Sequence, residues 1–184
     1  MAHPKHPPPY LYFLAITAKD LSSIFSIFSF LERDLGKICH QSSEYEFSKF
    51  TSYYTKEMGE PLKKALYFFE NLKPAEYLLE LKYKCYDIEK STASPSGFRT
   101  VNLDPGYLGL VKVVLSTFKD YAHRIYLGKG VFAEITLIYK DKSFRELPWT
   151  YPDYKQPEVI ETFNRVREIY RKKLQCLSTP TEEL

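Results

Sequence analysis

The sequence predicts an α+β fold of the α/β plait type, a ferredoxin-like βαββαβ core extended by a C-terminal β-hairpin and a terminal helix. Two observations predict it. Short apolar runs of strand length occur along the chain, and two of them are followed by segments with helical spacing of apolar residues. The resulting order of strand, helix, strand, strand, helix and strand is that of a plait. With 184 residues, the chain is long enough to bury one sizeable core.

The first strand and the first helix have the clearest patterns. Residues 10–17 are apolar on both faces, as in a central strand that is covered on both sides. Asp20 is a candidate cap for the helix that follows, and Gly36 is its expected stop. Polar and aromatic residues then alternate around residues 45–50, which predicts a second strand.

The second half of the plait follows the same logic. Residues 63–69 form a third predicted strand, and Pro74 opens a second helix that runs to about Lys90, because proline suits the first helical turn. Residues 99–103 resume as a strand. The run at 107–118 is either a short helix or a buried strand, since its leucines and valines fit both.

The C-terminal third predicts a hairpin and a helix. Strands at 123–127 and 131–139 flank a three-residue turn, Gly128–Gly130, which places Arg124 opposite Glu134. Helix 158–174 has acidic residues near its start and basic residues near its end, matching the helix dipole. On the hairpin, the alternate apolar residues are predicted to face the core: Ile125, Leu127, Val131, Ala133, Ile135 and Leu137.

One domain is expected over residues 10–176, between a flexible proline-rich arm at 1–9 and a flexible tail at 177–184. The net charge of +3 gives no broad electrostatic footprint for nucleic acid. The 3 widely spaced cysteines indicate reduced thiols, and the apolar run at 10–17 is too short to span a membrane. These observations predict a cytoplasmic protein with no membrane partner.

Several catalytic signatures are absent from the sequence. It contains no GxxxxGK[ST] phosphate loop, no GxGxxG, no HExxH, no CxxC and no GxSxG. The conventional P-loop nucleoside triphosphatase, dinucleotide oxidoreductase, zinc peptidase and serine hydrolase classes therefore lose support.

Acidic residues, basic residues and aromatics crowd together in residues 97–154, where we expect a cleft. Asp104 and Glu134 are the candidate catalytic carboxylates and also the candidate ligands of a magnesium ion, and His123 is a candidate acid or base. Asn102 lies two residues before Asp104 and shares its face. The simpler interpretations stay open: Asp104 belongs to a tight turn with proline and glycine, and His123 has a structural role.

The same segment supplies candidate ligand-binding groups. Arg124 is either half of a surface ion pair with Glu134 or an anion-binding residue that Glu134 holds in place. The segment Trp149–Tyr154 either packs over the core or forms a wall of the site. The candidate ligand-binding residues are Asn102, Lys112, Lys119, Arg124, Lys129, Tyr54, Trp149, Asp153 and Tyr154.

Four stretches of this chain resemble a bacterial family of uncharacterised proteins, domain-of-unknown-function family 4416. They are Phe50–Gly59, Arg99–Leu108, His123–Gly130 and Trp149–Tyr154. The resemblance covers nearly the whole chain after the proline-rich arm. The family has no assigned activity, so the resemblance implies no mechanism.

The leading hypothesis is that an anionic small molecule, phosphorylated or nucleotide-like, binds in a cleft lined by residues 97–154. Magnesium-dependent phosphoryl or nucleotidyl chemistry is the reaction class that paired carboxylates beside cations would suit. The alternative is a non-catalytic module that binds RNA or a protein, because sheets with exposed aromatics can stack on single-stranded bases. A scaffold role is expected if the polar hairpin face lies flat against solvent.

Overall fold

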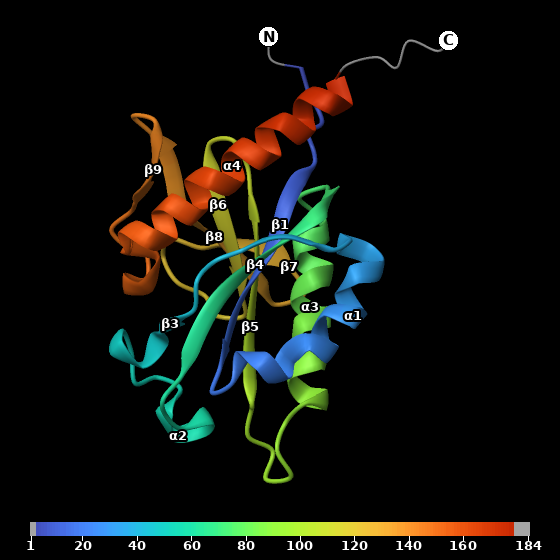
Figure 1. Cartoon of the computed structure of the whole chain (residues 1–184). Coiled ribbons are helices and arrows are strands. Elements are labelled where there is room, and N and C mark those ends of the chain that lie inside the picture. Colours follow the sequence, from blue (N-terminus) through green and yellow to red (C-terminus); the bar gives the residue numbers. More distant parts are fainter. Residues whose placement is uncertain (1–2, 179–184) are drawn as a thin grey trace.

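The computed structural model describes residues 3–178, and over these residues one nine-stranded antiparallel sheet forms the middle of the molecule (Figure 1). The strands are β1 (Tyr10–Ala18), β2 (Ile38–Gln41), β3 (Tyr45–Glu46), β4 (Lys63–Lys73), β5 (Val101–Leu108), β6 (Lys112–Thr117), β7 (Ile125–Gly128), β8 (Val131–Lys140) and β9 (Ser143–Glu146). Their order across the sheet is β2-β4-β1-β5-β6-β8-β7. In addition, β3 pairs with β4 and β9 pairs with β8.

Helices cover both faces of this sheet. Those that do so are α1 (Phe25–Leu35), α3 (Tyr77–Ser91) and α4 (Pro157–Ser178), and the short helix α2 (Thr55–Met58) precedes β4. Helices α1 and α3 lie together on one face, and α4 crosses the other (Figure 1). The molecule is therefore built in three layers, with the sheet between the helices.

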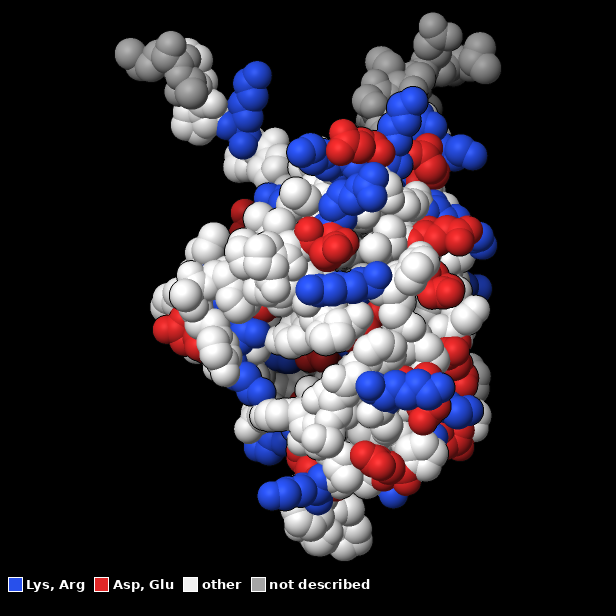
Figure 2. Space-filling view, turned by 90° about the vertical axis from the view of Figure 1, so that its left-hand side faces the viewer, with Lys and Arg blue, Asp and Glu red and all other residues white. Residues whose placement is uncertain are grey.

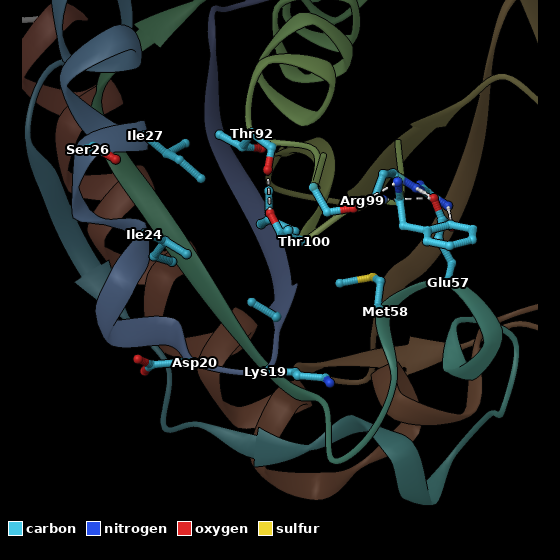
Figure 3. A pocket seen from close by; sticks show the side chains of 14 residues that line it. Lys19, Asp20, Ile24, Ser26, Ile27, Glu57, Met58, Thr92, Arg99 and Thr100 are labelled. Atoms are coloured by element: carbon cyan, nitrogen blue, oxygen red, sulfur yellow. Dashed lines mark hydrogen bonds and ion pairs between the residues drawn. The ribbon is translucent and has the colours of Figure 1, made fainter. Parts of the chain in front are cut away.

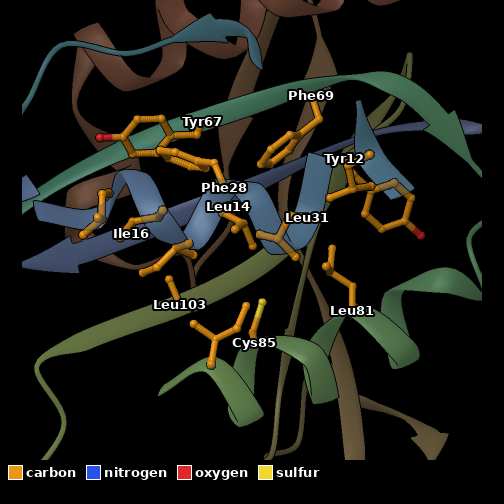
Figure 4. Packing of buried hydrophobic residues seen from close by; sticks show 14 of the residues in the cluster. Tyr12, Leu14, Ile16, Phe28, Leu31, Tyr67, Phe69, Leu81, Cys85 and Leu103 are labelled. Carbon is orange, nitrogen blue, oxygen red and sulfur yellow. The ribbon is translucent and has the colours of Figure 1, made fainter. Parts of the chain in front are cut away.

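Each face of the sheet has its own hydrophobic core, and β1 supplies alternate residues to both. Leu14 and Ile16 pack with Leu31 and Cys85 of the helices α1 and α3 (Figure 4). Phe13, one residue away from Leu14, packs instead on Phe163 of α4, with ring centroids 5.2 Å apart. This double burial explains why residues 10–17 are apolar on both faces, and the predicted central strand is confirmed.

The predicted ferredoxin-like βαββαβ core is wrong. The sheet does not stop at the fourth predicted strand but continues from β5 through β6, β8 and β7, and α4 covers the second face. The second predicted strand, at 45–50, is also wrong: it holds only the two residues of β3 before a short 3-10 helix, Phe47–Lys49. The prediction lacked the large antiparallel extension of the sheet. Local periodicity does not show that the later strands pair with the first four in one sheet.

The predicted tight turn at Asp104–Gly106 is wrong, because these residues continue strand β5 opposite β1. Proline is tolerated there because β5 pairs with β6 only from Gly106 onward, so an amide donor is not needed at Pro105 on that side. A Cβ atom on Gly106 would lie 2.5 Å from the carbonyl oxygen of Val114. The glycine therefore allows the backbones of β5 and β6 to approach closely. The segment 107–118, for which helix and strand were both open, forms the end of β5 and the whole of β6.

The hairpin between β7 and β8 has a two-residue turn rather than three. Gly128 pairs with Val131, and the turn residues Lys129 and Gly130 have φ values of 51° and 74°. Left-handed conformation at both positions is typical of the tight turn that suits a twisted hairpin.

The predicted core face of this hairpin is largely wrong. Val131 and Leu137 are buried, but Ile125 is 70% exposed. Ile125 belongs to β7, which lies at the edge of the sheet. Leu137 is buried on the opposite face from Ile135 because of a register shift against β6, where Val113 pairs with Leu137 while Val114 already pairs with Ile135. The extra residue in β8 reverses which face of the sheet the following side chains of β8 point to. As a result Glu134 and Leu137, three residues apart, both lie on the α4 side of the sheet.

Helix α4 extends past the predicted domain boundary to Ser178, and the rest of the predicted tail, 179–184, lies outside the described residues, as do residues 1–2 of the predicted arm. The carbonyl of Pro9 accepts a hydrogen bond from the Tyr170 hydroxyl at 2.9 Å. Across residues 3–178, no helix has the length and apolar character needed to cross a membrane.

Candidate functional site

A cavity of about 500 Å³ opens where β5 and β6 separate, and we call it the β5–β6 cavity. Figure 2 shows a hollow on the face of the molecule that carries β3 and α2, with acidic and basic side chains inside it. Four basic and four acidic residues line the cavity: Lys64, Lys82, Arg99 and Lys119, with Glu89, Asp104, Glu134 and Asp153. Its surroundings are therefore charged but close to electrically balanced.

Helix α3 supplies side chains along the part of β5 that pairs with β1 but has no partner on its β6 side. The carboxylate of Glu89 accepts a hydrogen bond from the backbone amide of Leu103 at 2.6 Å, and the ammonium of Lys82 donates to the carbonyl of the same residue at 3.3 Å. Burial raises the pKa of Glu89 to about 6, and the Leu103 amide opposes that rise. Two buried charged side chains thus replace the missing strand along this part of β5.

Asn102 and Asp104 form the floor of the cavity from strand β5. The Asn102 side-chain amide donates to Asp104 Oδ2 at 2.8 Å, and its oxygen accepts from Arg99 at 2.9 Å. The Lys82 ammonium lies 3.7 Å from Asp104 Oδ1. The predicted placement of both residues on one face is confirmed, because alternate strand residues share a side.

Arg99 anchors helix α2 beside the cavity. Its guanidinium donates two hydrogen bonds to Glu57, from Nε at 2.8 Å and from Nη2 at 2.6 Å. These contacts raise the pKa of Arg99 and lower the pKa of the Glu57 carboxyl. The bidentate geometry fixes the segment before β4, including Tyr54, over the cavity.

Glu134 reaches the cavity from β8 with only one of its oxygens paired. Its Oε2 accepts from Arg124 Nε at 2.8 Å and lies 3.1 Å from His123 Nε2. Its Oε1 is buried and has no hydrogen-bond partner among the described residues. The Arg124 and Glu134 side chains are only 4% and 2% exposed, so this is a buried pair and not the surface pair that was one of the two alternatives.

Each guanidinium nitrogen of Arg124 makes one hydrogen bond, and Arg124 itself does not line the cavity. It donates to the Lys119 carbonyl at 2.9 Å and to the Tyr151 hydroxyl at 2.8 Å, as well as to Glu134. Its hydrogen bonds therefore link strand β8 to the segments that contain Lys119 and Tyr151.

A second buried pair lies at the other side of the cavity. The ammonium of Lys64 is 2.7 Å from Asp153 Oδ2, which also accepts from the Tyr45 hydroxyl at 3.1 Å. The same ammonium lies 4.7 Å from the ring centroids of Phe47 and Tyr154. The Tyr154 hydroxyl is buried and has no hydrogen-bond partner among residues 3–178.

Aromatic side chains make up much of the remaining wall. At the rim, the exposed Lys119 ammonium lies 4.0 Å above the Tyr53 ring and donates to the Tyr53 hydroxyl at 2.7 Å. Burial raises the pKa of Tyr54 above its usual range. The aromatic lining residues are Phe47, Phe50, Tyr53, Tyr54, Tyr86, Phe118, Tyr151 and Tyr154.

The structure brings together some of the predicted site residues and separates others. The residues that line the cavity are Asn102, Asp104, Lys119, Glu134, Tyr54, Asp153 and Tyr154. His123 and Trp149 do not: their rings stack on each other, 5.2 Å apart at 14°, behind Glu134. Lys112 starts β6 opposite Ile138, and Lys129 is in the β7–β8 turn.

Sequence reasoning missed Lys64, Lys82, Glu89 and Arg99. A signal existed for two of them, because Lys82 lies on the buried face of helix α3 and Glu89 follows two turns later on the same face. A lysine and a glutamate within an apolar stripe need partners, which points to a polar site nearby.

The magnesium hypothesis receives no ligand set from the structure. Within residues 3–178, no group of three or more His, Cys, Asp or Glu residues could hold a metal ion. Asp104 and Glu134 remain the two carboxylates that were predicted to bind one.

A second cavity of about 420 Å³ lies on the α1 side of the Arg99–Glu57 pair (Figure 3). Ile24, Ile27 and Met58 give it an apolar wall, and Arg99 lines both cavities. The ion pair therefore separates the two spaces.

Comparison with known proteins gives a family but no activity. The model of one family, described as "Domain of unknown function (DUF4416)", matches residues 8–170. A search of the curated proteins and a search of the solved structures gave no match. The family match includes every strand of the sheet and the whole β5–β6 cavity. The chain therefore belongs to the family of unknown function DUF4416.

Proposed function

We propose that this protein binds an anionic small molecule in the β5–β6 cavity. The supporting observation is a pair of lysines beside the cavity with donors to spare. Lys119 is exposed and donates its hydrogen bond to the Tyr53 hydroxyl, and it has no acidic partner within ion-pair distance among the described residues. Lys82 is buried and contacts its acidic neighbour only at 3.7 Å. Ammonium groups with free N–H donors suit phosphoryl oxygens.

The walls suit a ligand with a ring. Tyr53, Tyr86 and Phe118 are exposed aromatic side chains in the cavity lining, and they offer apolar area on which a ring could pack. The cavity volume of about 500 Å³ is within the ordinary range for small-molecule sites. An anion that also carries a ring would fit this combination of size, aromatic walls and cations.

Chemical turnover would be a further step. Asp104 and Glu134 are the residues to which we assign acid–base work if a reaction occurs. His123 and Arg124 would act through Glu134, since both contact its carboxylate from outside the cavity. The proposal concerns binding and does not require a metal.

A thermal-shift screen tests the proposal. Pyrophosphate, ribose 5-phosphate, ATP and GTP would each be added to the full chain, and a compound present at one hundred times its dissociation constant should add about 2.7 kcal/mol of stability. We expect at least one to raise the melting temperature, and Lys119→Ala to remove most of that shift.

Two predicted lysines outside the cavity provide matched controls. Lys112→Ala and Lys129→Ala remove the same charge, and neither should change the shift. A shift that persists in Lys119→Ala and disappears in Lys129→Ala would contradict the proposal. Binding of single-stranded RNA alone, with a steep dependence on salt, would favour the alternative of an RNA-binding module.

A further inference from the structure

The geometry points to a phosphorylated sugar, free or as part of a nucleotide, as the ligand class of the β5–β6 cavity. Asp104 and Glu134 would accept hydrogen bonds from its hydroxyl groups. This inference rests on the function proposed above and goes further, because it names what the ligand carries besides negative charge.

The first step concerns the space between Lys82 and Asp104. Their charged atoms are 3.7 Å apart, which is too long for a direct hydrogen bond. Asp104 Oδ2 is already taken by Asn102, and the Asp104 side chain is 31% exposed within the cavity lining. The two residues can therefore each take a ligand group, an anionic oxygen at Lys82 and a hydrogen-bond donor at Asp104.

The second step concerns Glu134. Arg124 and His123 both contact Oε2, which leaves the buried Oε1 without a partner among the described residues. A carboxylate that is ion-paired with arginine accepts hydrogen bonds and donates none. A ligand that satisfies this oxygen must bring an O–H or N–H group.

The third step separates a hydroxylated ligand from other classes. A compact polyanion such as pyrophosphate would meet the carboxylates of Asp104 and Glu134 as well as the lysines, and like charges repel. A ligand ammonium at Asp104 would lie beside the Lys82 ammonium. Neutral hydroxyl groups avoid both conflicts, and the carbon skeleton of a sugar can pack on the aromatic walls.

Calorimetric titration with matched ligand pairs tests this inference. Ribose 5-phosphate is compared with 2-deoxyribose 5-phosphate, and ATP with 2′,3′-dideoxy-ATP. Pyrophosphate and phosphoethanolamine serve as the compact anion and the amine. We expect the hydroxylated member of at least one pair to bind about tenfold more tightly than its partner, the size of effect expected for a hydrogen bond to a charged group. A preference within the ribose pair indicates a free sugar phosphate as the ligand, and a preference within the ATP pair indicates a nucleotide.

Substitutions then locate the preference. Asp104→Asn places an amide donor at the acceptor position and should reduce the preference to within about twofold. A folded Glu134→Gln variant should reduce the preference by the same amount. If Glu134→Gln does not fold, Asp104→Asn alone decides the test, because it alters a partly exposed side chain. Glu89→Gln is the control: Glu89 also lines the cavity, but its Oε1 already binds the Leu103 amide, so the preference should stay about tenfold.

The outcomes separate this inference from the proposed function. Equal binding of both members of each pair, or tighter binding of pyrophosphate or phosphoethanolamine, overturns the sugar assignment and leaves anion binding intact. A preference that survives in Asp104→Asn and in a folded Glu134→Gln overturns the assignment of the two acceptors. No binding by any of these phosphate compounds overturns the proposed function as well.

Discussion

The ammonium group of Lys82 lies 3.7 Å from the carboxylate of Asp104, although helix α3 packs on one face of the sheet and Asp104 lies on the other. The contact passes through the gap beside β5, which pairs with β1 along its length but with β6 only from Gly106 onward. The same gap forms the β5–β6 cavity. The ion pair, the edge of the strand and the candidate site are therefore consequences of one feature of the sheet.

Replacement of Lys82 by methionine should destabilise the fold while nearly preserving side-chain volume. The Leu103 carbonyl loses a hydrogen-bond donor and Asp104 loses its cation, which should lower the free energy of unfolding by about 1–3 kcal/mol. Urea denaturation measures this change. Lys90→Met, on the exposed side of the same helix, is the control and should stay within about 0.5 kcal/mol of the wild type.

Glu89 should make stability depend on pH in a defined direction. Its pKa in the folded protein, about 6, is above the ordinary value of 4.5 for a glutamate, so folding favours the protonated carboxyl. The contribution of Glu89 to the free energy of unfolding should therefore be most favourable below about pH 4.5. It should fall as the pH rises through about 6. The difference corresponds to about 2 kcal/mol.

Glu89→Gln checks this pH dependence. The variant should lose the component between about pH 4.5 and 6, and be less sensitive to pH than the wild type in urea denaturation across that range. A wild-type stability that rises through the same interval, and a variant that rises in parallel, would show that burial does not control this carboxyl.

The Lys64–Asp153 pair should be costly to break at one end. Both side chains are almost fully buried, at 5% and 3% exposure, so Asp153→Leu leaves an unpaired buried ammonium. We expect a loss of about 3–5 kcal/mol in the free energy of unfolding. The double substitution of Lys64→Met with Asp153→Leu should recover much of that loss, because no buried charge remains. Equal destabilisation by the single and double variants would argue against the pair as the cause.

Gly106→Ala should be far more damaging than Gly109→Ala. The new methyl group at 106 would meet the backbone oxygen of Val114 at 2.5 Å, and backbone can move only with the strand. At Gly109 the nearest atoms belong to the Tyr10 ring, a side chain that can shift. Thermal denaturation of the two variants should place the melting temperature of Gly106→Ala clearly below that of Gly109→Ala.

The sequence predicts those elements whose burial is set locally. The apolar run of β1, the helical stripes of α3 and α4, and the glycine that ends α1 all appear where their patterns place them. The overall architecture could not be obtained in this way. Which strands pair across long separations is decided by the whole sheet, and a register shift between Val113 and Val114 cannot be read from alternation along β8.

The candidate site was predicted in part for the same reason. Asn102, Asp104 and Glu134 belong to neighbouring parts of the sheet, and their polar character within strands marked them. Lys82 and Glu89 come from a helix on the opposite face and reach the cavity through the gap beside β5. Sequence gives no indication of that gap, because it depends on where β6 leaves β5.

The most direct test is calorimetric titration of ribose 5-phosphate and ATP into the wild type, Lys119→Ala and Lys129→Ala. Both lysines lie in exposed segments near β7, but only Lys119 lines the β5–β6 cavity. We predict measurable binding of at least one compound, weakened about tenfold or more by Lys119→Ala and by no more than about twofold by Lys129→Ala. Equal affinities in all three proteins, or no heat of binding with either compound, would contradict anion binding in this cavity.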